Sequence, residues 1–242
     1  PFTSKNTEKF VKNFKWIKAS INGGTAEDYK NVHQTKKEEF KKVLSNFERC
    51  AKIRDENIYD CTLGGQMLLL PENKNGAVNL AKELRSIGAD YFVIKPYTQS
   101  QLGISHKHEG LTYDDMLYLE QELRTYETDS FKIVFRTNAM NKLKAEKLPY
   151  TKCYSTPNFW GYIMADGGVY TCQTFAGDDR FLIGNINKQS FQSIWEGDKR
   201  KKQFDFMMND LDISECRKNC RMDEVNRYLW DLKHPSKHVN FI

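Results

Sequence analysis

The sequence predicts an α/β protein in which a parallel sheet is followed by a smaller, cysteine-rich α+β segment. From Trp16 to about Thr137, apolar runs typical of strands alternate with stretches of helical periodicity. This alternation is typical of a parallel sheet with right-handed crossover connections. From Cys153 onward the pattern changes to a short hairpin and helices that include four of the six cysteines. We therefore expect two domains, at residues 1–148 and 149–242.

The elements of the first domain follow from local sequence signals. Strands are expected at Trp16–Ile21, Tyr59–Leu70, Asp90–Lys95 and Phe131–Arg136. Helices are expected at Thr7–Phe14, from a capping box at Thr35–Glu38 to about Arg54, at Ala77–Ile87 and at Thr112–Tyr126. Gly88 follows the third of these helices, where a left-handed C-cap requires glycine.

Polar side chains follow the predicted strands. They are Ser20, Asn22, Glu72, Asn73, Lys95, Arg136 and Asn138. In parallel α/β sheets, ligands bind at the carboxyl ends of the strands. The clustering of these residues therefore predicts a ligand site, although polar residues also end strands that bind nothing.

Four cysteines of the second segment could meet at one centre. Asp166-Gly167-Gly168 predicts a tight hairpin between Phe159–Ala165 and Val169–Cys172, with Cys153 on the incoming chain. Cys216 and Cys220 are four residues apart, so on a helical turn their thiols would share one face.

The spacing of these cysteines leaves several interpretations open. Disulfides suit small secreted domains, but this chain is long enough for an ordinary core and shows no secretory signal. A structural zinc site usually draws on two close cysteine pairs, whereas only Cys216 and Cys220 form such a pair. An iron–sulfur cluster tolerates more varied spacing. The fourth interpretation is that these cysteines are unrelated core residues.

A family resemblance favours the cluster. The spacing of Cys153, Gly167 and Cys172 resembles the Cys-x(9–15)-Gly-x4-Cys motif of SPASM and twitch domains, the auxiliary iron–sulfur modules of radical S-adenosylmethionine (radical SAM) enzymes. Arg180–Asn187 and Ser190–Glu196 also resemble the family's passage before its last cysteines. The resemblance implies that four residues bind one [4Fe–4S] cluster, as in the single-cluster twitch form: Cys153, Cys172, Cys216 and Cys220.

The first half resembles the later strands of a radical SAM barrel. The similar stretches are Trp16–Gly24 and Gly88–Tyr97. This resemblance implies a partial (β/α) TIM-type barrel and a cofactor site for S-adenosyl-L-methionine formed by Ser20, Asn22, His33 and Lys95. In this family, the serine of the strand and a basic residue about a dozen positions later contact the methionyl part of the cofactor.

One departure from the family is large. Radical SAM enzymes hold their catalytic cluster with a Cys-x3-Cys-x2-Cys loop, and the sequence contains no such triplet. Cys50 and Cys61 do not replace it, because they lie on an amphipathic helix and in a strand and are expected to be small core residues. The chain is therefore either a truncated piece or a degenerate relative of the family. Truncation is the simpler interpretation, so we expect a fragment that lacks the N-terminal segment and is inactive by itself.

The resemblance also implies a function for the intact enzyme. A 5′-deoxyadenosyl radical would abstract hydrogen from a small-molecule, sugar or peptide substrate, and the auxiliary cluster would accept an electron. The expected outcome is a net oxidation, with epimerisation or bond formation as alternatives. Flavodoxin or ferredoxin is the expected electron donor. The alternative function is a zinc-binding interaction module in which the four cysteines hold the metal without catalysis.

Composition indicates a cytoplasmic protein with no membrane partner, because no apolar run is long enough to span a bilayer. A formal net charge of +5, with its lysines mixed with acids, makes nucleic acid an unexpected partner. After Cys220 we expect a helix that buries Val225, Tyr228, Leu229 and Leu232, followed by an extended tail. His234 and His238 are expected to be surface or capping residues, since Pro235 breaks their helical pairing.

Overall fold

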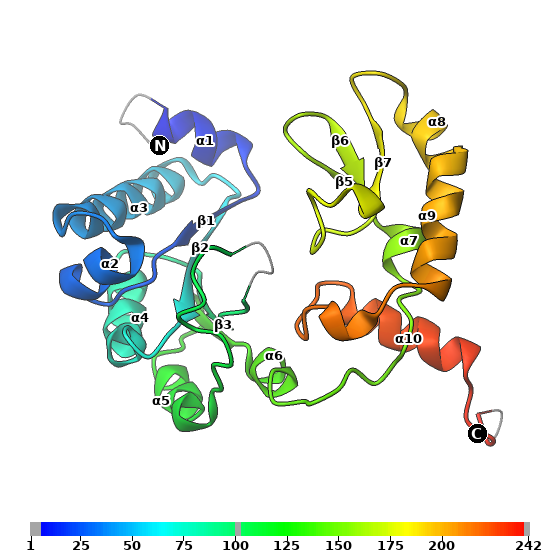
Figure 1. The fold of residues 1–242 in the computed structure, drawn as a ribbon. Coiled ribbons are helices and arrows are strands. Elements are labelled where there is room, and N and C mark those ends of the chain that lie inside the picture. Colours follow the sequence, from blue (N-terminus) through cyan, green and yellow to red (C-terminus); the bar gives the residue numbers. More distant parts are fainter. Residues whose placement is uncertain (1–5, 100–102, 240–242) are drawn as a thin grey trace. The chain divides into compact units, whose positions relative to one another are not determined.

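The computed structural model describes residues 6–99 and 103–239 and divides the chain into two compact units (Figure 1). The first unit comprises Pro1–Tyr97 and Gly110–Asn141. The second comprises Thr98–Glu109 and Lys142–Ile242. Each unit has its own sheet, so the two are described separately.

The first unit is built on a four-stranded parallel sheet. Its strands are β1 (Trp16–Ser20), β2 (Thr62–Leu69), β3 (Tyr91–Pro96) and β4 (Lys132–Phe135), in the order β1-β2-β3-β4. The predicted parallel sheet is therefore confirmed, with small differences at the strand ends. Strand order follows chain order, as expected when each crossover leads to the neighbouring strand.

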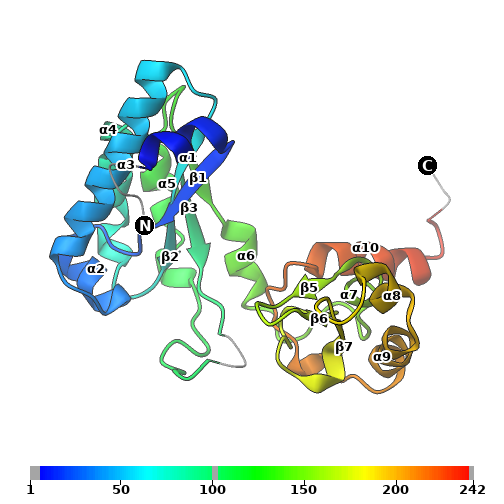
Figure 2. The same cartoon turned by 90° about the horizontal axis from the view of Figure 1, so that it is seen from above.

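Helices connect these strands. They are α1 (Thr7–Asn13), α2 (Ala26–His33), α3 (Glu38–Asn57), α4 (Ala77–Ser86), α5 (Leu119–Arg124) and α6 (Thr137–Lys142), with short 3₁₀ turns η1 (Lys74–Gly76) and η2 (Asp114–Met116). Figure 2 shows α2, α3 and α4 on the same side of the sheet. In β4, Ile133 and Phe135 are buried while Lys132 and Val134 are exposed. This alternation is what a sheet shows when only one face is covered by a core.

The expected start of α3 was wrong. The sequence Thr35–Glu38 does not cap α3, which begins after Lys37 without a side-chain cap. Instead, Thr25 caps α2, a helix that was not predicted, and its Oγ1 accepts a hydrogen bond from the N–H of Asp28 at 3.1 Å. Both threonines have the residue type of an N-cap, and Thr25 has the extended backbone that capping requires.

The second unit combines a three-stranded antiparallel sheet with helices. Its elements are α7 (Thr156–Phe159), β5 (Tyr162–Ile163), β6 (Gly168–Tyr170), η3 (Asp179–Phe181), β7 (Leu182–Asn185), α8 (Phe191–Glu196), α9 (Asp198–Asn209), η4 (Ile213–Glu215) and α10 (Asp223–Lys233). The sheet order is β5-β6-β7. Gly167 has φ +84° in the turn between β5 and β6, which confirms the predicted hairpin.

The expected buried face of α10 was wrong. Val225, Tyr228 and Leu232 are 38%, 64% and 61% exposed, and Leu229 is half-buried. The residues that α10 buries are Asp223 and Asn226, which hydrogen-bond to neighbouring segments of the second unit. Helical periodicity indicated an amphipathic helix correctly but could not show that its polar face packs inward.

The tail was predicted to be extended, but residues 237–239 form a turn in which the N–H of Val239 donates to the carbonyl of Ser236 at 3.3 Å. The last part of the predicted tail, residues 240–242, lies outside the described residues. Within residues 6–99 and 103–239, no helix is both long enough and apolar enough to cross a membrane.

Candidate metal centre

Four cysteines from separate parts of the second unit line one small cavity, which we call the cysteine cavity. They are Cys153, Cys172, Cys216 and Cys220, and none of them forms a disulfide. The space between the side chains is about 30 Å³, and its other walls are mainly apolar. The structure therefore brings the predicted ligand set to one place in the fold.

The local structure around Cys216 and Cys220 differs from the prediction. They do not share a helical turn, because η4 ends at Glu215 and Cys216 has an extended backbone with ψ 152°. A turn at Lys218 and Asn219 then leads to Cys220, just before α10. A loop thus brings both thiols to the cavity, so the four-residue spacing indicated proximity without indicating the local structure.

Asn226 on α10 fixes the backbone on both sides of Cys153. Its Oδ1 accepts hydrogen bonds from the N–H of Tyr154 at 2.6 Å and of Ser155 at 3.1 Å. Its Nδ2 donates to the carbonyl of Lys152 at 2.9 Å. Asn226 is 1% exposed and also lines the cysteine cavity. No sequence signal indicated this role, because asparagine has no special propensity at that position of a helix.

Several donors surround the cysteine sulfurs. Thr156 Oγ1 lies 3.2 Å from Cys153 Sγ, and the N–H of Met222 donates to Cys220 Sγ at 3.4 Å. Burial raises the pKa of the Cys172 thiol, while the backbone N–H groups of Phe175 and Thr174 act in the opposite direction. Hydrogen bonds of this kind stabilise a thiolate, and around an iron–sulfur cluster they adjust its reduction potential.

A buried carboxylate supports α10 beside the cavity. Asp223 accepts hydrogen bonds from Tyr150 Oη at 2.9 Å, Lys142 Nζ at 2.6 Å and Arg227 Nε at 2.9 Å. Burial by itself raises the pKa of Asp223, but these three donors outweigh it and hold that pKa below its usual value. Burial and the neighbouring Asp223 carboxylate raise the pKa of Tyr150, so its hydroxyl remains a donor. The network fixes the start of α10, which lies close after Cys220.

The four cysteines share one cavity, although the described side chains form no site for a single metal ion. Among residues 6–99 and 103–239, no three His, Cys, Asp or Glu side chains lie close enough together to hold one metal ion. Nevertheless, all four cysteines line the same cavity. In a [4Fe–4S] cluster each cysteine binds a different iron atom, so the four sulfurs are farther apart than around one zinc ion.

The predicted cofactor residues of the first unit lie near the carboxyl end of the sheet. Ser20 ends β1 and its Oγ accepts a hydrogen bond from Gln66 at 3.4 Å. Lys95 lies in β3 and is half-buried. Glu72, Arg136 and Asn138, which the sequence also placed after strands, are exposed.

Asn22 and His33 are joined by a hydrogen bond. The N–H of Asn22 donates to His33 Nε2 at 3.1 Å, so this nitrogen is unprotonated and the imidazole is neutral. Burial lowers the pKa of His33, which also favours the neutral ring. Asn22 Oδ1 in turn accepts from the N–H of Leu68 at 2.8 Å. Both predicted residues therefore contribute to local structure, and cofactor binding by them stays a prediction.

Asn73 joins the loop after β1 to the segment after β2 by hydrogen bonds. It is fully buried, its Oδ1 accepts from the N–H of Leu70 at 2.8 Å, and its Nδ2 donates to the carbonyls of Asn22 and Leu68. Gly24 lies so close to Gly76 that an added Cβ would be 1.8 Å from the carbonyl oxygen of Gly76. The loop after β1 is thus held tightly against the segment after β2.

The remaining two cysteines are core residues, as expected. Cys50 and Cys61 are buried in the first unit. Burial raises the pKa of Cys50 to about 11, so its thiol is protonated at neutral pH.

Comparison with known families finds a match for one segment of the second unit. Residues 153–221 match the family model described as SPASM, an iron–sulfur cluster-binding domain. This segment of the chain is therefore similar to SPASM domains. All four cysteines of the cysteine cavity lie within the matched segment. The match confirms the resemblance inferred from the Cys153, Gly167 and Cys172 spacing, and an iron–sulfur cluster is the group that the matched family binds.

Solved structures share the fold of the chain beyond the SPASM domain. SuiB from Streptococcus suis matches with a TM-score of 0.57 at 11% identity, covering 82% of this chain and 47% of SuiB. SuiB bound to S-adenosylmethionine matches with a TM-score of 0.56 at 13% identity, covering 82% of this chain and 46% of that one. Native anSMEcpe with bound AdoMet matches with a TM-score of 0.51 at 12% identity, covering 100% of this chain and 72% of that one.

These matches show a common fold and leave activity open, because identity is low. The aligned region spans less than half of the SuiB chains. A comparison with curated protein sequences found no match.

Proposed function

We propose that this chain is part of a radical SAM enzyme whose SPASM domain holds an auxiliary [4Fe–4S] cluster in the cysteine cavity. The observation that carries this proposal is the convergence of Cys153, Cys172, Cys216 and Cys220 on one cavity within the matched SPASM segment. In this proposal, residues 1–148 supply the later strands of a partial TIM-type barrel. The single-cluster twitch form suits the four cysteines present in the segment.

The cysteine residues define what kind of chemistry the site can support. Four protein thiolates occupy one coordination position on each iron, which leaves no iron open to substrate. When bound, such a cluster supplies one-electron transfer. Hydrogen bonds to Cys153, Cys172 and Cys220 would stabilise the thiolates and exclude water from them. Electron transfer therefore fits this site better than direct binding of substrate.

The first unit would position S-adenosylmethionine and substrate. Its assignment is supported by the parallel sheet and by the shared fold with structures that contain S-adenosylmethionine. Ser20, Asn22, His33 and Lys95 are the proposed cofactor contacts. Because His33 is neutral and its Nε2 already accepts from Asn22, we assign it hydrogen bonding instead of charge pairing.

We propose net oxidation or modification of a small-molecule, sugar or peptide substrate, in a reaction begun by the 5′-deoxyadenosyl radical. Flavodoxin or ferredoxin is the proposed electron donor. The sequence contains no Cys-x3-Cys-x2-Cys triplet, so we expect this chain alone to leave S-adenosylmethionine intact.

Metal analysis of anaerobically purified protein tests this proposal. We expect a brown protein with about four iron and four sulfide per chain. Cys172→Ala should remove most of the iron, because Cys172 is a buried wall of the cavity. Cys50→Ala is the matched control, since Cys50 is a similarly buried thiol in the first unit. A colourless protein with about one zinc would contradict the proposal and support the interaction module.

A further inference from the structure

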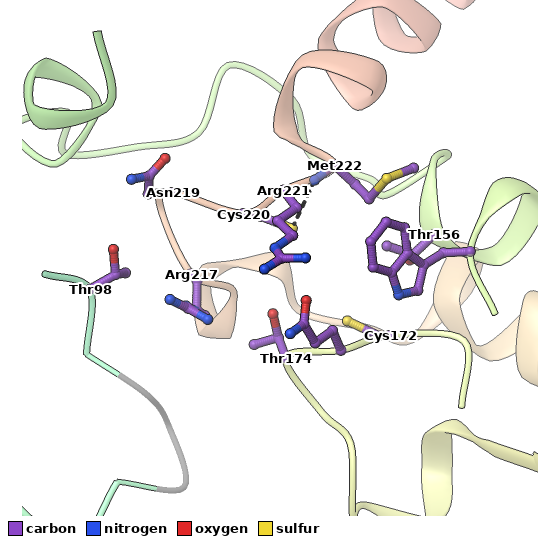
Figure 3. Close-up of a pocket in the computed structure, with 11 residues that line it drawn as sticks. Thr98, Thr156, Cys172, Thr174, Arg217, Asn219, Cys220, Arg221 and Met222 are labelled. Atoms are coloured by element: carbon purple, nitrogen blue, oxygen red, sulfur yellow. Dashed lines mark hydrogen bonds between the residues drawn. The ribbon is translucent and has the colours of Figure 1, made fainter. Parts of the chain in front are cut away.

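A second cavity lies beside the cysteine cavity in the second unit. Its volume is about 220 Å³, and we call it the arginine pocket after Arg217 and Arg221 (Figure 3). Cys172 and Cys220 line both cavities, whereas Cys153 and Cys216 line only the cysteine cavity. A cluster held by all four thiols would therefore be centred in the cysteine cavity. The arginine pocket would remain on the outer side of two of its ligands.

The arginine pocket is positively charged. Figure 3 shows the guanidinium groups of Arg217 and Arg221 extending toward the side of the pocket that carries Thr174. None of the described side chains that line the pocket is an Asp or Glu. The Arg217 charge also reaches Cys220, where it lowers a thiol pKa that burial raises more strongly. Guanidinium groups bind carboxylate and phosphate oxygens by paired hydrogen bonds.

Two buried donors of this pocket have no hydrogen-bond partner. Trp160 Nε1 and Arg217 Nε are both inaccessible to solvent, and neither finds an acceptor among the described residues. Most buried polar groups in folded proteins are hydrogen-bonded, because a buried group without a partner loses the hydrogen bonds that water would give it. Two such donors in the lining of one cationic pocket indicate an acceptor supplied by a ligand.

We propose that the arginine pocket binds an anionic group of the substrate, either a carboxylate or a phosphate, next to the auxiliary cluster. This inference rests on the proposed function, and it adds the chemical class of the substrate. Oxygens of the anion accept from the guanidinium groups of Arg217 and Arg221 and from Trp160 Nε1. The bound molecule is thereby held against the wall formed by Cys172 and Cys220, on a short path for an electron to the cluster.

The same arginines have a competing explanation, which the experiment must separate. A cluster held by four thiolates carries negative charge, and nearby cations stabilise it. If that is the only role of Arg217 and Arg221, their loss lowers iron content and no added anion binds. If the pocket holds a substrate anion, their loss weakens anion binding while iron is retained.

The test is calorimetric titration of the iron-loaded chain with inorganic phosphate and, separately, with succinate. We expect one saturable site per chain, and the tighter of the two probes identifies phosphate or carboxylate as the natural group. Arg217→Gln and Arg221→Gln should each weaken binding about tenfold, the effect of losing one charge-assisted hydrogen bond. Lys218→Gln is the matched control, because Lys218 lies between Arg217 and Asn219, is exposed and does not line the pocket.

Trp160→Phe provides a variant that keeps an aromatic ring and the charge. Loss of the indole N–H should weaken binding several-fold with unchanged iron content. The inference is overturned if the iron-loaded chain shows no saturable binding, if Lys218→Gln weakens binding as much as Arg217→Gln, or if both arginine variants lose their iron. A chain that contains no iron would instead overturn the proposed function itself.

Discussion

The two units differ in how they satisfy their buried polar groups. In the first unit, the polar loops after the strands hydrogen-bond to one another, as Asn73 does with Asn22, Leu68 and Leu70. Buried side-chain atoms without a partner among the described residues are Gln66 Oε1 in the first unit and, in the second unit, atoms of Trp160, Thr171, Arg200, Gln203 and Arg217. Among the described residues, the second unit therefore has more buried polar atoms without a hydrogen-bond partner than the first unit.

The apolar core of the second unit is also smaller than that of the first unit. The first unit has a continuous sheet core in which Leu63, Met67, Leu69, Phe92 and Ile94 are completely buried. The strands of the second unit are two to four residues long, and its main core surrounds the cysteines. A small apolar core provides little stability by itself, and metal binding commonly supplies the remainder. We therefore expect the first unit to be stable alone and the second unit to depend on the proposed cluster.

Removal of iron should give the largest effect. Anaerobic chelation should destabilise the second unit by several kcal/mol, because the free energy of cluster binding is part of its folding free energy. The first unit should be unaffected. Hydrogen exchange read peptide by peptide measures this, since it reports opening separately for each segment. Equal loss of protection in α4 and in α10 would contradict the difference between the units.

Asn226→Ala should give the next largest effect. It leaves the N–H groups of Tyr154 and Ser155 and the carbonyl of Lys152 without their partner, at a cost of about 3 kcal/mol. Iron content should fall as well, because the same backbone positions Cys153. The measurement is thermal unfolding of the second unit together with iron analysis.

Asn158→Ala is the matched control for this variant. Asn158 also bonds the backbone of Tyr154, through Nδ2 to its carbonyl, but it is exposed. A change within about 0.5 kcal/mol and full iron content are expected. If Asn226→Ala and Asn158→Ala have the same stability and the same iron content, Asn226 is not a positioning residue for Cys153.

The difference between the units also explains how much could be predicted from the sequence. The parallel sheet was predictable, because apolar strands and amphipathic helices leave a local pattern. The convergence of the four cysteines was predictable from a family motif. Asn226, Arg217 and Trp160 were missed, since a hydrogen bond or charge in a cavity depends on segments that meet only in the fold.

The wrong predictions for the start of α3 and the buried face of α10 also arose because these features depend on contacts made only in the fold. Thr25 and Thr35 both have the residue type of an N-cap, but only Thr25 directly precedes a helix with the extended backbone that capping requires. Val225 and Tyr228 were expected in a core because apolar residues usually face one. In α10, hydrogen bonds by Asp223 and Asn226 determine the buried face instead.

Asn73→Ala tests whether the stability of the first unit is independent of iron binding in the second unit. The substitution removes three hydrogen bonds at a fully buried position and should cost about 2–3 kcal/mol. Iron content should not change. Denaturant unfolding of the first unit, followed by hydrogen exchange in β2, measures the cost. A loss of iron in this variant would show that the two units are not independent.

Acidification should give the smallest effect, located at His33. Burial lowers the pKa of this imidazole, so the unfolded chain takes up the proton more readily than the folded one. The stability contributed by neutral His33 is therefore complete above the unfolded pKa of about 6.5 and is lost as pH falls through the lower folded value.

Protonation would turn Nε2 from an acceptor into a donor facing the N–H of Asn22, at a cost of about 1 kcal/mol. Exchange of the Asn22 amide, corrected for its intrinsic pH dependence, should therefore accelerate as the pH falls below about 6.5. The cluster-free Cys172→Ala protein is the suitable background, because acid loss of iron then plays no part. His33→Gln should abolish the pH dependence, and its persistence in that variant would show that another group loosens the loop after β1.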